Sequence, residues 1–457
     1  MTRVIFITSM DVAANGRIRK QADSLAQNGY KVTVVGPECH WEDNQPAHFS
    51  FIALDKDNKW VKMLILTISL LIITSSLFIA FISWILSVSV LFVTAISGIA
   101  VLFLVFLTFR HKINNLLSSI FTGEQQLLPT LVNWLSHQKL LWNIKWALRN
   151  LNFSIIEVCD YQVLQAGIAA KTATNCALVY DAAEIYQGMP SVSDATTRYI
   201  NKLNIKAGKF IDMIFVVNQI HLEFYAKEYP ETAQPIVIRN SAPQIEMLSK
   251  SGKLHKACNL PRQQKIALFH GGFSRQRGLP ELLQGAYRYA PDDWTVVLMG
   301  DGALKQELQQ LQSRLTKKCN RKIAPVVIIP PVHFSELFSY ITDASYGLIP
   351  YQGGVENQDT CSPNKLWEYP MAGVPVLVSP RKLMKKIVEE NDIGLVVEDH
   401  RYCKPIFEAL SNFDLIVQKQ KIIACDKFSK RENWSQEEKI LLDAYQKLQG
   451  KSHRTRD

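Results

Sequence analysis

Residues 271–278 combine glycines with basic side chains directly after a strand-like run of apolar residues. Gly271 and Gly272 allow a tight turn and let the backbone approach a ligand closely. Arg275 and Arg277 come just before the expected start of a helix, where the helix dipole favours an anion. These residue types suit the binding of phosphate groups, and an ordinary glycine-rich turn is the alternative.

A second stretch predicts a helix over residues 363–372 that carries one carboxylate, Glu368, in an apolar run. Ser362 suits the N-cap and Pro363 the first helical position. The backbone N–H groups of that first turn, with a lysine beside them, suit a diphosphate. Glu368 could accept two hydrogen bonds from a ribose diol, or it could form a structural ion pair with a cation. The candidate ligand-binding residues of both stretches are Gly271, Gly272, Arg275, Arg277, Asn364, Lys365 and Glu368.

Carboxylates of the N-terminal half follow predicted strands. Asp181 and Glu184 come at and after the strand 177–181, and Asp160 follows the strand 154–158. Because ligands of parallel sheets lie at the carboxyl ends of strands, all three are candidates for catalysis at one cleft. Helix capping is an equally common role for such side chains. The sequence shows no Ser–His–Asp set and no metal-ligand spacing, so we expect no metal and find no support for a hydrolase or a metalloenzyme.

Strand-like and helix-like runs that alternate along the chain must position these residues. One series begins with the strands 3–8 and 31–35 on either side of a helical run, and a second begins at the strand 265–270. Such alternation predicts a parallel sheet covered by helices on both faces. The predicted fold class is therefore α/β, with two Rossmann-like domains joined near residues 241–262 and a cleft between them.

A long uncharged segment interrupts the first series, because no charged residue occurs between Met63 and Phe109. One helix of this length would far exceed the ~30 Å hydrocarbon core of a membrane, whereas two helices of about 20 residues fit it. Basic residues flank the segment on both sides, among them Arg110 and Lys112, which predicts that both ends are cytoplasmic. We therefore expect a two-helix transmembrane hairpin in the inner membrane, and a buried core hairpin is the alternative.

The chain divides into four expected parts. They are an N-terminal domain over 1–59 and 113–245, an inserted hairpin over 60–112, a C-terminal domain over 262–430, and a terminal helix with a basic tail over 431–457. Residues 113–150 mix leucines, tryptophans and lysines, which suits either a helix at a membrane interface or a helix that covers the sheet.

Composition narrows the function classes. An apolar content of 47% with 20% charged residues is that of a globular protein, which excludes global disorder. The net charge of +10 is spread along the chain, so it does not indicate a nucleic-acid partner and suits anionic lipid or a phosphate-bearing substrate. The eight cysteines form no C-x-x-C pair, which predicts reduced thiols rather than disulfides or a zinc site.

Four stretches together resemble the retaining GT-B glycosyltransferases, and specifically the family-four-like, group 1 glycosyl transferases. They are NGRIRKQADSLAQNGYKVTVVG (15–36), VYDAAEIY (179–186), GGFSRQRGLPELL (271–283) and SPNKLWEYPMAGVPVLVS (362–379). The last stretch is the most specific to the family. The resemblance implies that the second domain holds a UDP- or GDP-linked sugar, that the first domain holds the acceptor, and that the terminal helix crosses back onto the first domain.

The resemblance also implies roles for single residues. Arg277 matches the basic loop residue that pairs with the diphosphate, and Glu368 matches the second residue of the family's two-glutamate motif, which binds ribose. The first glutamate of that motif corresponds to Thr360, which the resemblance adds to the donor-binding residues. The other basic loop residue corresponds to Gly272, and a strand-end histidine to Ala183. These departures affect the contacts with the sugar more than those with the nucleotide.

The first of the four stretches supplies the loop on the acceptor side, with Asn15, Gly16 and Arg17. Retaining members of the family are thought to use no protein nucleophile, and no cofactor beyond the nucleotide sugar is expected. In them the departing diphosphate assists attack on the same face of the sugar, so positioning and charge stabilisation supply most of the catalysis.

The hairpin and the resemblance together predict a membrane-anchored glycosyltransferase. It would move a sugar, with retention, to a lipid-linked or surface-polysaccharide acceptor at the cytoplasmic face, as in lipopolysaccharide or exopolysaccharide synthesis. One alternative is a sugar-nucleotide 2-epimerase on the same scaffold, which needs no hairpin. Another is a non-catalytic transferase that acts as an assembly partner in polysaccharide synthesis, which the departures at Thr360, Gly272 and Ala183 suggest.

Overall fold

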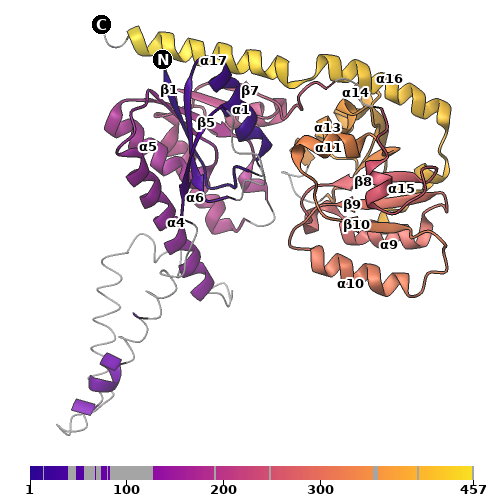
Figure 1. The fold of residues 1–457 in the computed structure, drawn as a ribbon. Coiled ribbons are helices and arrows are strands. Elements are labelled where there is room, and N and C mark those ends of the chain that lie inside the picture. Colours follow the sequence, from indigo (N-terminus) through magenta and orange to yellow (C-terminus); the bar gives the residue numbers. More distant parts are fainter. Residues whose placement is uncertain are drawn as a thin grey trace.

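A computed structural model describes residues 1–13, 15–39, 48–55, 67, 74–79, 81–82, 127–189, 192–245, 249–353, 359–398 and 401–454. Two α/β domains lie side by side in it, and each is built on one parallel sheet (Figure 1). The predicted pair of Rossmann-like domains is therefore present.

The N-terminal sheet has the strand order β3-β2-β1-β4-β5-β6-β7, and all of its strand pairs are parallel. Its strands are β1 (Arg3–Ile7), β2 (Lys31–Pro37), β3 (Ser50–Leu54), β4 (Ile155–Val158), β5 (Ala177–Ala182), β6 (Met213–Val216) and β7 (Pro235–Val237). Its helices are α1 (Gly16–Gln27), α4 (Leu127–Leu148), α5 (Leu164–Thr174), α6 (Asp194–Gly208) and α7 (Gln219–Glu228), with 3-10 turns at Tyr161–Val163 and Tyr186–Gly188.

The C-terminal sheet has the strand order β10-β9-β8-β11-β12-β13 and is likewise parallel. Its strands are β8 (Lys265–His270), β9 (Trp294–Met299), β10 (Val326–Ile329), β11 (Tyr346–Ile349), β12 (Val376–Val378) and β13 (Gly394–Val396). Its helices are α8 (Lys253–Ala257), α9 (Leu279–Tyr289), α10 (Lys305–Thr316), α11 (Phe334–Ile341), α13 (Lys365–Met371), α14 (Lys382–Asn391) and α15 (Lys404–Ser411), with 3-10 turns at Arg275–Arg277 and Arg401–Cys403.

Alternation along the strands places apolar side chains on both faces of the N-terminal sheet, as a strand period of two requires. On β1, Ile5 and Ile7 belong to one buried cluster, and Val4 and Phe6 belong to another. The first cluster includes residues of α4 and α5, and the second includes residues of α1 and of the C-terminal helix. Burial on both faces explains why these strands read as continuous apolar runs.

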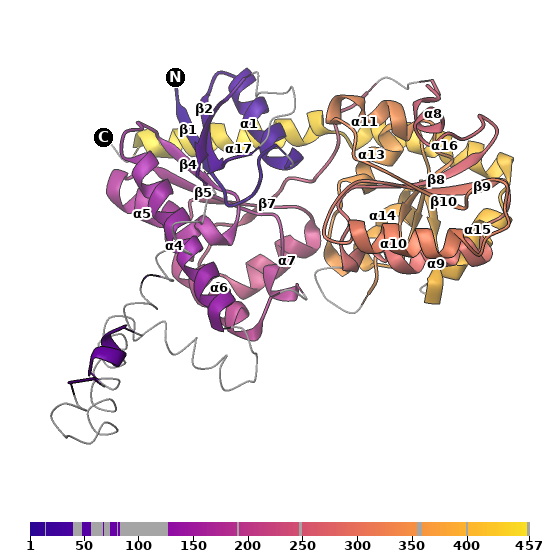
Figure 2. The same cartoon turned by 60° about the horizontal axis from the view of Figure 1, so that its bottom comes forward.

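The last two helices connect the domains. Helix α16 (Leu415–Arg431) packs on α13, and α17 (Trp434–Arg454) runs back over the N-terminal domain (Figures 1 and 2). The indole Nε1 of Trp434 donates to Ser24 Oγ at 2.9 Å, and the Tyr445 hydroxyl donates to the buried Glu157 of β4. Arg239, in the segment between the domains, pairs with Glu437 of α17 at 2.7 Å.

The membrane part of the prediction is corrected. Most of the expected hairpin, residues 60–112, lies outside the described residues. Across the parts of the chain that the structure does describe, no helix is both long enough and apolar enough to cross a membrane. Helix α4 has 22 residues but includes Lys139 and Lys145, and a spanning helix needs about 20 predominantly apolar residues. The transmembrane hairpin in the predicted fold class and the integral inner-membrane location are therefore not supported.

Helix α4 also decides between the two interpretations of residues 113–150. Leu141, Ile144 and Leu148 are buried in the core of the N-terminal domain, while Trp142 and Trp146 are exposed. One face of the described part of α4 thus packs in the core that covers the sheet. The structure therefore favours the sheet-covering interpretation for the described part of this segment.

Candidate active site

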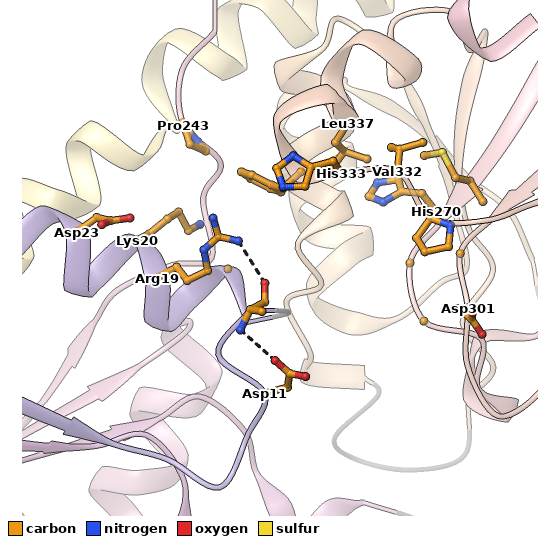
Figure 3. A pocket seen from close by; sticks show the side chains of 18 residues that line it. Asp11, Arg19, Lys20, Asp23, Pro243, His270, Asp301, Val332, His333 and Leu337 are labelled. Carbon is orange, nitrogen blue, oxygen red and sulfur yellow. Dashed lines mark hydrogen bonds between the residues drawn. The ribbon is translucent and has the colours of Figure 1, made fainter. Parts of the chain in front are cut away.

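A cavity of about 670 Å³ lies between the two domains (Figure 3). One wall comes from α1 and the loop before it, with Asp11, Ala13, Gly16, Arg19, Lys20 and Asp23. The opposite wall comes from the ends of β8, β9 and β10 and from α11. Its residues are His270, Gly271, Gly272, Met299, Gly300, Asp301, Pro331, Val332, His333, Phe334 and Leu337. Pro243, in the segment between the domains, completes the lining. These positions are the carboxyl ends of strands, where open α/β sheets bind ligands.

The glycine-rich loop follows β8 and lines the cavity. Gly271 follows β8 with φ of +116°, a conformation that L side chains rarely adopt. A Cβ at this position would lie 3.3 Å from Lys365 Nζ, whereas a Cβ at Gly272 would meet nothing within 4 Å. Both glycines line the cavity, so the backbone of the loop is open to a ligand there.

Two cations lie close together beside this loop. The guanidinium of the half-buried Arg277 lies 4.1 Å from the ring centroid of Tyr351, and the ammonium of the buried Lys365 lies 3.8 Å from that of Phe269. Burial lowers the pKa of Lys365 well below its usual value, and the charge of Arg277 lowers it further. Within the described residues neither cation forms an ion pair, so the pair offers an anion-binding position.

Arg275 behaves differently from Arg277, although both belong to the same 3-10 turn. Its side chain is 73% exposed and pairs with Glu307 of α10 at 2.8 Å. Neither arginine is among the residues that line the cavity, but Arg277 lies with Lys365 over the ring of Tyr351. The residue types alone could not distinguish the two arginines, because the turn sends them in different directions.

Helix α13 is shorter than predicted. It begins at Lys365 rather than 363, with Asn364 exposed at its N-cap position and Pro370 inside it. Ser362 does not cap the helix, because its Oγ accepts a hydrogen bond from Trp367 Nε1 at 3.0 Å. The predicted helix start is therefore replaced by a turn, and the lysine side chain rather than a capped helix end faces the glycine loop.

Glu368 is buried, and its Oε2 lies 3.4 Å from Nε2 of His270. Burial raises the pKa of Glu368 to about 7, while the charges of Lys20 and Lys365 oppose this rise. Burial and the charge of Lys365 lower the pKa of His270 well below its usual value, so this ring is neutral at pH 7. The alternative of a structural ion pair with lysine or arginine is not what the structure shows among the described residues.

Asp181 and Arg17, predicted for catalysis and for the acceptor-side loop, form a buried ion pair with each other. Arg17 Nε donates to Asp181 Oδ2 at 2.8 Å and Nη2 donates to Oδ1 at 2.7 Å. Gln21 Nε2 donates to Asp181 Oδ2 at 3.3 Å, and Arg17 also donates to the carbonyl of Ile238 at 2.6 Å. Neither Asp181 nor Arg17 lines the cavity, so the structure gives both a role in holding the N-terminal domain together.

Asp160 is also occupied by its own domain. It is buried and accepts hydrogen bonds from Thr8 Oγ1 at 3.1 Å, from the Ser9 backbone at 2.8 Å and from the Gln162 backbone at 2.9 Å. The capping interpretation of this residue therefore accounts for its contacts.

The acceptor-side loop divides in the same way. Asn15 is the N-cap of α1, and its Oδ1 accepts from the backbone of Arg17 at 3.1 Å and of Ile18 at 3.2 Å. Gly16 lines the cavity at the start of the helix. Of the three residues predicted for this loop, only Gly16 faces the cleft among the described cavity walls.

Glu184 lies near the C-terminal half of the site. Burial raises the pKa of Cys361 to about 12, and the charge of Glu184 raises it further. The same carboxylate opposes the lowering of the Arg277 pKa by burial. Thr360, next to Cys361, is buried, and its carbonyl accepts from Asn218 Nδ2 of the N-terminal domain at 2.9 Å. Glu184 is therefore the predicted N-terminal carboxylate whose charge affects Arg277 of the C-terminal domain.

Sequence reasoning missed most of the cavity wall, including Lys20, His270 and Phe334. Lys20 follows Gly16 by one helical turn and so shares its face, and His270 immediately precedes the glycine loop. The position of each residue beside a predicted site residue could therefore have identified it from the sequence. The guanidinium of Arg19 lies 5.9 Å from the ring centroid of Phe334 across the cleft, a contact that no local pattern indicates.

A family model matches the C-terminal domain, and solved structures match the whole chain. Residues 264–412 match the family model described as glycosyl transferases group 1. A search of curated proteins found no match.

Among the described residues, no group of three or more His, Cys, Asp or Glu side chains could hold a metal ion.

Solved structures resemble the whole chain. Sucrose-phosphate synthase from Thermosynechococcus elongatus has a TM-score of 0.65 at 12% identity, over 98% of this chain and 100% of that chain. The α,α-trehalose 6-phosphate synthase from Burkholderia multivorans has a TM-score of 0.64 at 11% identity, over 100% and 99%. The Anabaena protein HepE in complex with UDP-glucose has a TM-score of 0.63 at 11% identity, over 98% and 100%.

At such low identities the structural likeness establishes the fold, and the family match adds the enzyme class through the C-terminal domain. The predicted resemblance is thus confirmed, with two Rossmann-like domains in the GT-B arrangement. This chain has the GT-B fold of these glycosyltransferases, and its residues 264–412 match the model of the glycosyl transferases group 1.

Proposed function

We propose that this protein transfers a sugar from a nucleotide-sugar donor, with retention, to an acceptor held by the N-terminal domain. The observation that carries the proposal is the pair of cations Arg277 and Lys365, which lie over aromatic rings without an ion-pair partner among the described residues. Removing charges from water without a partner costs several kcal/mol per ion. A diphosphate would supply the missing negative charge for both cations at once.

The rest of the donor fits around that position. Gly271 and Gly272 open the backbone to the diphosphate, and Glu368, whose Oε2 lies 3.4 Å from Nε2 of the cavity-lining His270, suits the ribose hydroxyls. Val332, His333 and Phe334 also line the cavity, and we assign the base to them. Structural neighbours support this choice of ligand, since HepE is known with UDP-glucose and the E. coli trehalose-6-phosphate neighbour with UDP-2-fluoro glucose.

The chemistry requires little from protein side chains. The bond between the sugar C1 and the diphosphate breaks, the bond between C1 and the acceptor oxygen forms on the same face, and the acceptor proton passes to the departing diphosphate. Arg277 and Lys365 would stabilise the negative charge that develops on that diphosphate. Of the predicted catalytic carboxylates we retain only Glu184, which lies on this side of the site and could hold the sugar hydroxyls. Asp160 and Asp181 are engaged elsewhere.

The acceptor is a separate part of the proposal. The sequence predicted a lipid-linked or surface-polysaccharide acceptor, while a Burkholderia xenovorans neighbour, a trehalose-phosphate synthase, is known with glucose-6-phosphate. Both are sugars that present a hydroxyl group. Product analysis with a lipid-linked sugar in one arm and glucose-6-phosphate in the other distinguishes them, and epimerised free nucleotide sugar without any acceptor would instead favour the 2-epimerase.

Calorimetric titration with UDP-glucose and GDP-mannose tests the donor site. We expect the wild type to bind one of them, and Lys365→Met or Arg277→Gln to weaken that binding about a hundredfold, the effect of losing one or two charge-assisted contacts of about 1.5–3 kcal/mol each. Arg275→Gln is the matched control, because it removes an exposed arginine of the same turn. Unchanged affinity in both Lys365→Met and Arg277→Gln would overturn the proposal.

A further inference from the structure

Two side-chain amides on the N-terminal side of the cleft hydrogen-bond to the backbone of the C-terminal domain. Asn218 Nδ2 donates to the carbonyl of Thr360 at 2.9 Å, and Asn240 Nδ2 donates to the carbonyl of Ser362 at 3.1 Å. Asn218 follows β6, and Asn240 follows β7, which is the parallel neighbour of β6 in the sheet. Helix α7, which begins after Asn218, lies on the side of the N-terminal domain that faces the other domain (Figure 2). Both donors therefore come from the carboxyl ends of adjacent strands.

The amide of Asn218 has both of its ends occupied. Its Oδ1 accepts a hydrogen bond from the backbone N–H of His221 at 2.9 Å and so caps α7. The cap requires an acceptor and the carbonyl of Thr360 requires a donor, so the amide has a single orientation that satisfies both. Because Asn218 is buried, the helix cap holds its Nδ2 toward the C-terminal domain.

Asn240 is oriented in the same way by a charged group. Its Oδ1 accepts from Arg17 Nη1 at 3.1 Å, and a guanidinium can only donate. Arg17 is itself fixed by its two hydrogen bonds to Asp181. The buried ion pair of the N-terminal domain thus orients the amide that reaches Ser362.

The two carbonyls that accept these bonds lie just before α13. Thr360 and Ser362 are both buried, and Ser362 Oγ accepts from Trp367 Nε1 of α13 at 3.0 Å. This contact connects the segment 360–362 to the helix that carries Lys365. The N-terminal side of the cleft therefore holds the C-terminal domain beside its proposed donor site.

We propose that Asn218 and Asn240 are positioning residues, which hold the segment 360–362 against the N-terminal domain and so set the distance between the acceptor and the donor sugar. The inference rests on the proposed function, since it takes the two substrates from the two domains. Two contacts on carbonyls of the same segment restrict the rotation of the domains as well as their separation. Both amides bind backbone atoms, so the contact does not depend on the side chain of Thr360, which stands where the family has a glutamate.

Donor binding and sugar transfer should depend on this contact differently. Gly271, Gly272, Arg277 and Lys365, to which we assign the diphosphate, all belong to the C-terminal domain, so this part of the donor site persists when the domains separate. Transfer in addition requires the acceptor oxygen within about 3–3.5 Å of the sugar C1, and a misplacement of about 1 Å lowers the rate strongly. Loss of the two amides should therefore lower kcat and leave donor affinity nearly unchanged.

Asn218→Ser and Asn240→Asp, alone and combined in the full chain, remove the contact and keep the local structure. Serine caps a helix about as well as asparagine, but its side chain is too short to reach the carbonyl of Thr360. Ionised aspartate still accepts from Arg17 but has no hydrogen to donate to Ser362. Asn218→Asp, which also keeps the cap, is the second variant if Asn218→Ser unfolds.

Asn391→Asp is the matched control for these variants. Like Asn240, Asn391 accepts from a guanidinium, that of Arg431, and donates to a carbonyl, that of Ile387 at 2.8 Å. Its partners lie on α14 and α16, so the substitution removes the same kind of hydrogen bond without touching the N-terminal domain.

Calorimetric titration with UDP-glucose and GDP-mannose measures donor affinity, and product analysis with a lipid-linked sugar or glucose-6-phosphate measures transfer. We expect each single variant to lower kcat about tenfold and the double variant about a hundredfold, while donor affinity stays within about threefold of the wild type. Asn391→Asp should change neither quantity. An unchanged kcat in the double variant would overturn the inference. A loss of donor affinity as large as the loss of kcat would also overturn it, because the amides would then shape the donor site itself.

Hydrogen–deuterium exchange of residues 359–372, followed by mass spectrometry without any substrate, tests the contact independently of transfer. We expect faster exchange in the double variant than in Asn391→Asp, because separation of the domains exposes this buried segment. Equal exchange in the two proteins would overturn the inference and leave the proposed function intact. Failure of the wild type to transfer a sugar to either acceptor would count against the proposed function and with it the role in transfer, while faster exchange in the double variant would still establish the contact between the domains.

Discussion

The two domains differ in how they treat charged side chains near the ends of their strands. In the N-terminal domain Asp181 is paired twice with Arg17, and Asp160 accepts three hydrogen bonds. In the C-terminal domain Arg277 and Lys365 lie over aromatic rings without an ion-pair partner among the described residues. The position of a charge at a strand end is therefore a poor guide to function. A charge that the fold removes from water and leaves without a counter-charge is a better one.

The largest effect on stability should come from breaking the buried ion pair of Arg17 and Asp181. Asp181→Asn leaves Arg17 buried without its counter-charge, which should destabilise the protein by about 3–5 kcal/mol. Urea denaturation measures the loss. Asp293→Asn is the control, because Asp293 is exposed and pairs with Lys265 at the surface, where such pairs contribute less than about 1 kcal/mol. Wild-type stability with abolished transfer in Asp181→Asn would instead return Asp181 to the catalytic residues.

For the cations of the C-terminal domain we expect the opposite result: a loss of donor binding without a loss of stability. Lys365→Met removes a buried cation that has no ion-pair partner among the described residues, so the thermal midpoint should stay unchanged or rise while donor affinity is lost. Differential scanning fluorimetry with and without UDP-glucose measures both effects on one sample. A loss of stability comparable to that of Asp181→Asn would show that Lys365 is structural and would remove the contrast between the domains.

Glu157 sharpens the comparison within the N-terminal domain, because this carboxylate of β4 is completely buried beneath α17. Burial raises its pKa to about 8, above the value of an ordinary glutamate, and Tyr445 donates to it. The folded state thus holds the proton more tightly than the unfolded state, so the stability from this group is present at low pH and is lost as the pH rises towards 8. We expect the thermal midpoint to fall by a few degrees between pH 5.5 and 8.

Glu157→Gln should make that dependence flatter, because glutamine does not titrate. Thermal unfolding at pH 5.5, 7 and 8 measures the slope for both proteins. An identical slope in wild type and variant would show that Glu157 is ionised throughout and stabilised by its neighbours.

The smallest effect is expected at the exposed arginine. Arg275→Gln removes a surface pair with Glu307 and should change stability by less than about 1 kcal/mol, with donor affinity unchanged. Isothermal titration of Arg275→Gln and Arg277→Gln with the same nucleotide sugar compares their donor affinities directly. A loss of affinity equal to that of Arg277→Gln would restore the predicted donor-binding role of Arg275.

Much of the fold could be predicted from local patterns. The runs that became β1, β2, β4, β5 and β8 are apolar on both faces and bounded by turn residues, which is what buried parallel strands require. The edge strands β3 and β13 were missed, because they are short and most of their side chains are partly exposed, so their patterns are weak. The uncharged segment from Met63 to Phe109 led to a hairpin that the described part of the structure does not support.

The candidate site shows where the sequence stopped being informative. It selected Gly271, Gly272 and Arg277 by type and order, and it selected Glu368 by its isolation in an apolar run. It also selected Asp160, whose partners Thr8 and Ser9 lie in the loop after β1. These partners are about 150 residues away in the chain, at separations of 152 and 151 residues. No local pattern reports which distant group a carboxylate will meet.

The sequence by itself therefore determined the two alternating domains and the glycine loop, because strand period, turn chemistry and helix caps act over a few residues. Only the tertiary structure decided which charges are neutralised. It brought Arg17 to Asp181 across 164 residues of chain, and it left Arg277 and Lys365 over aromatic rings without an ion-pair partner among the described residues. Electrostatic pairing depends on distance in space and on burial, and both are set when the domains pack together.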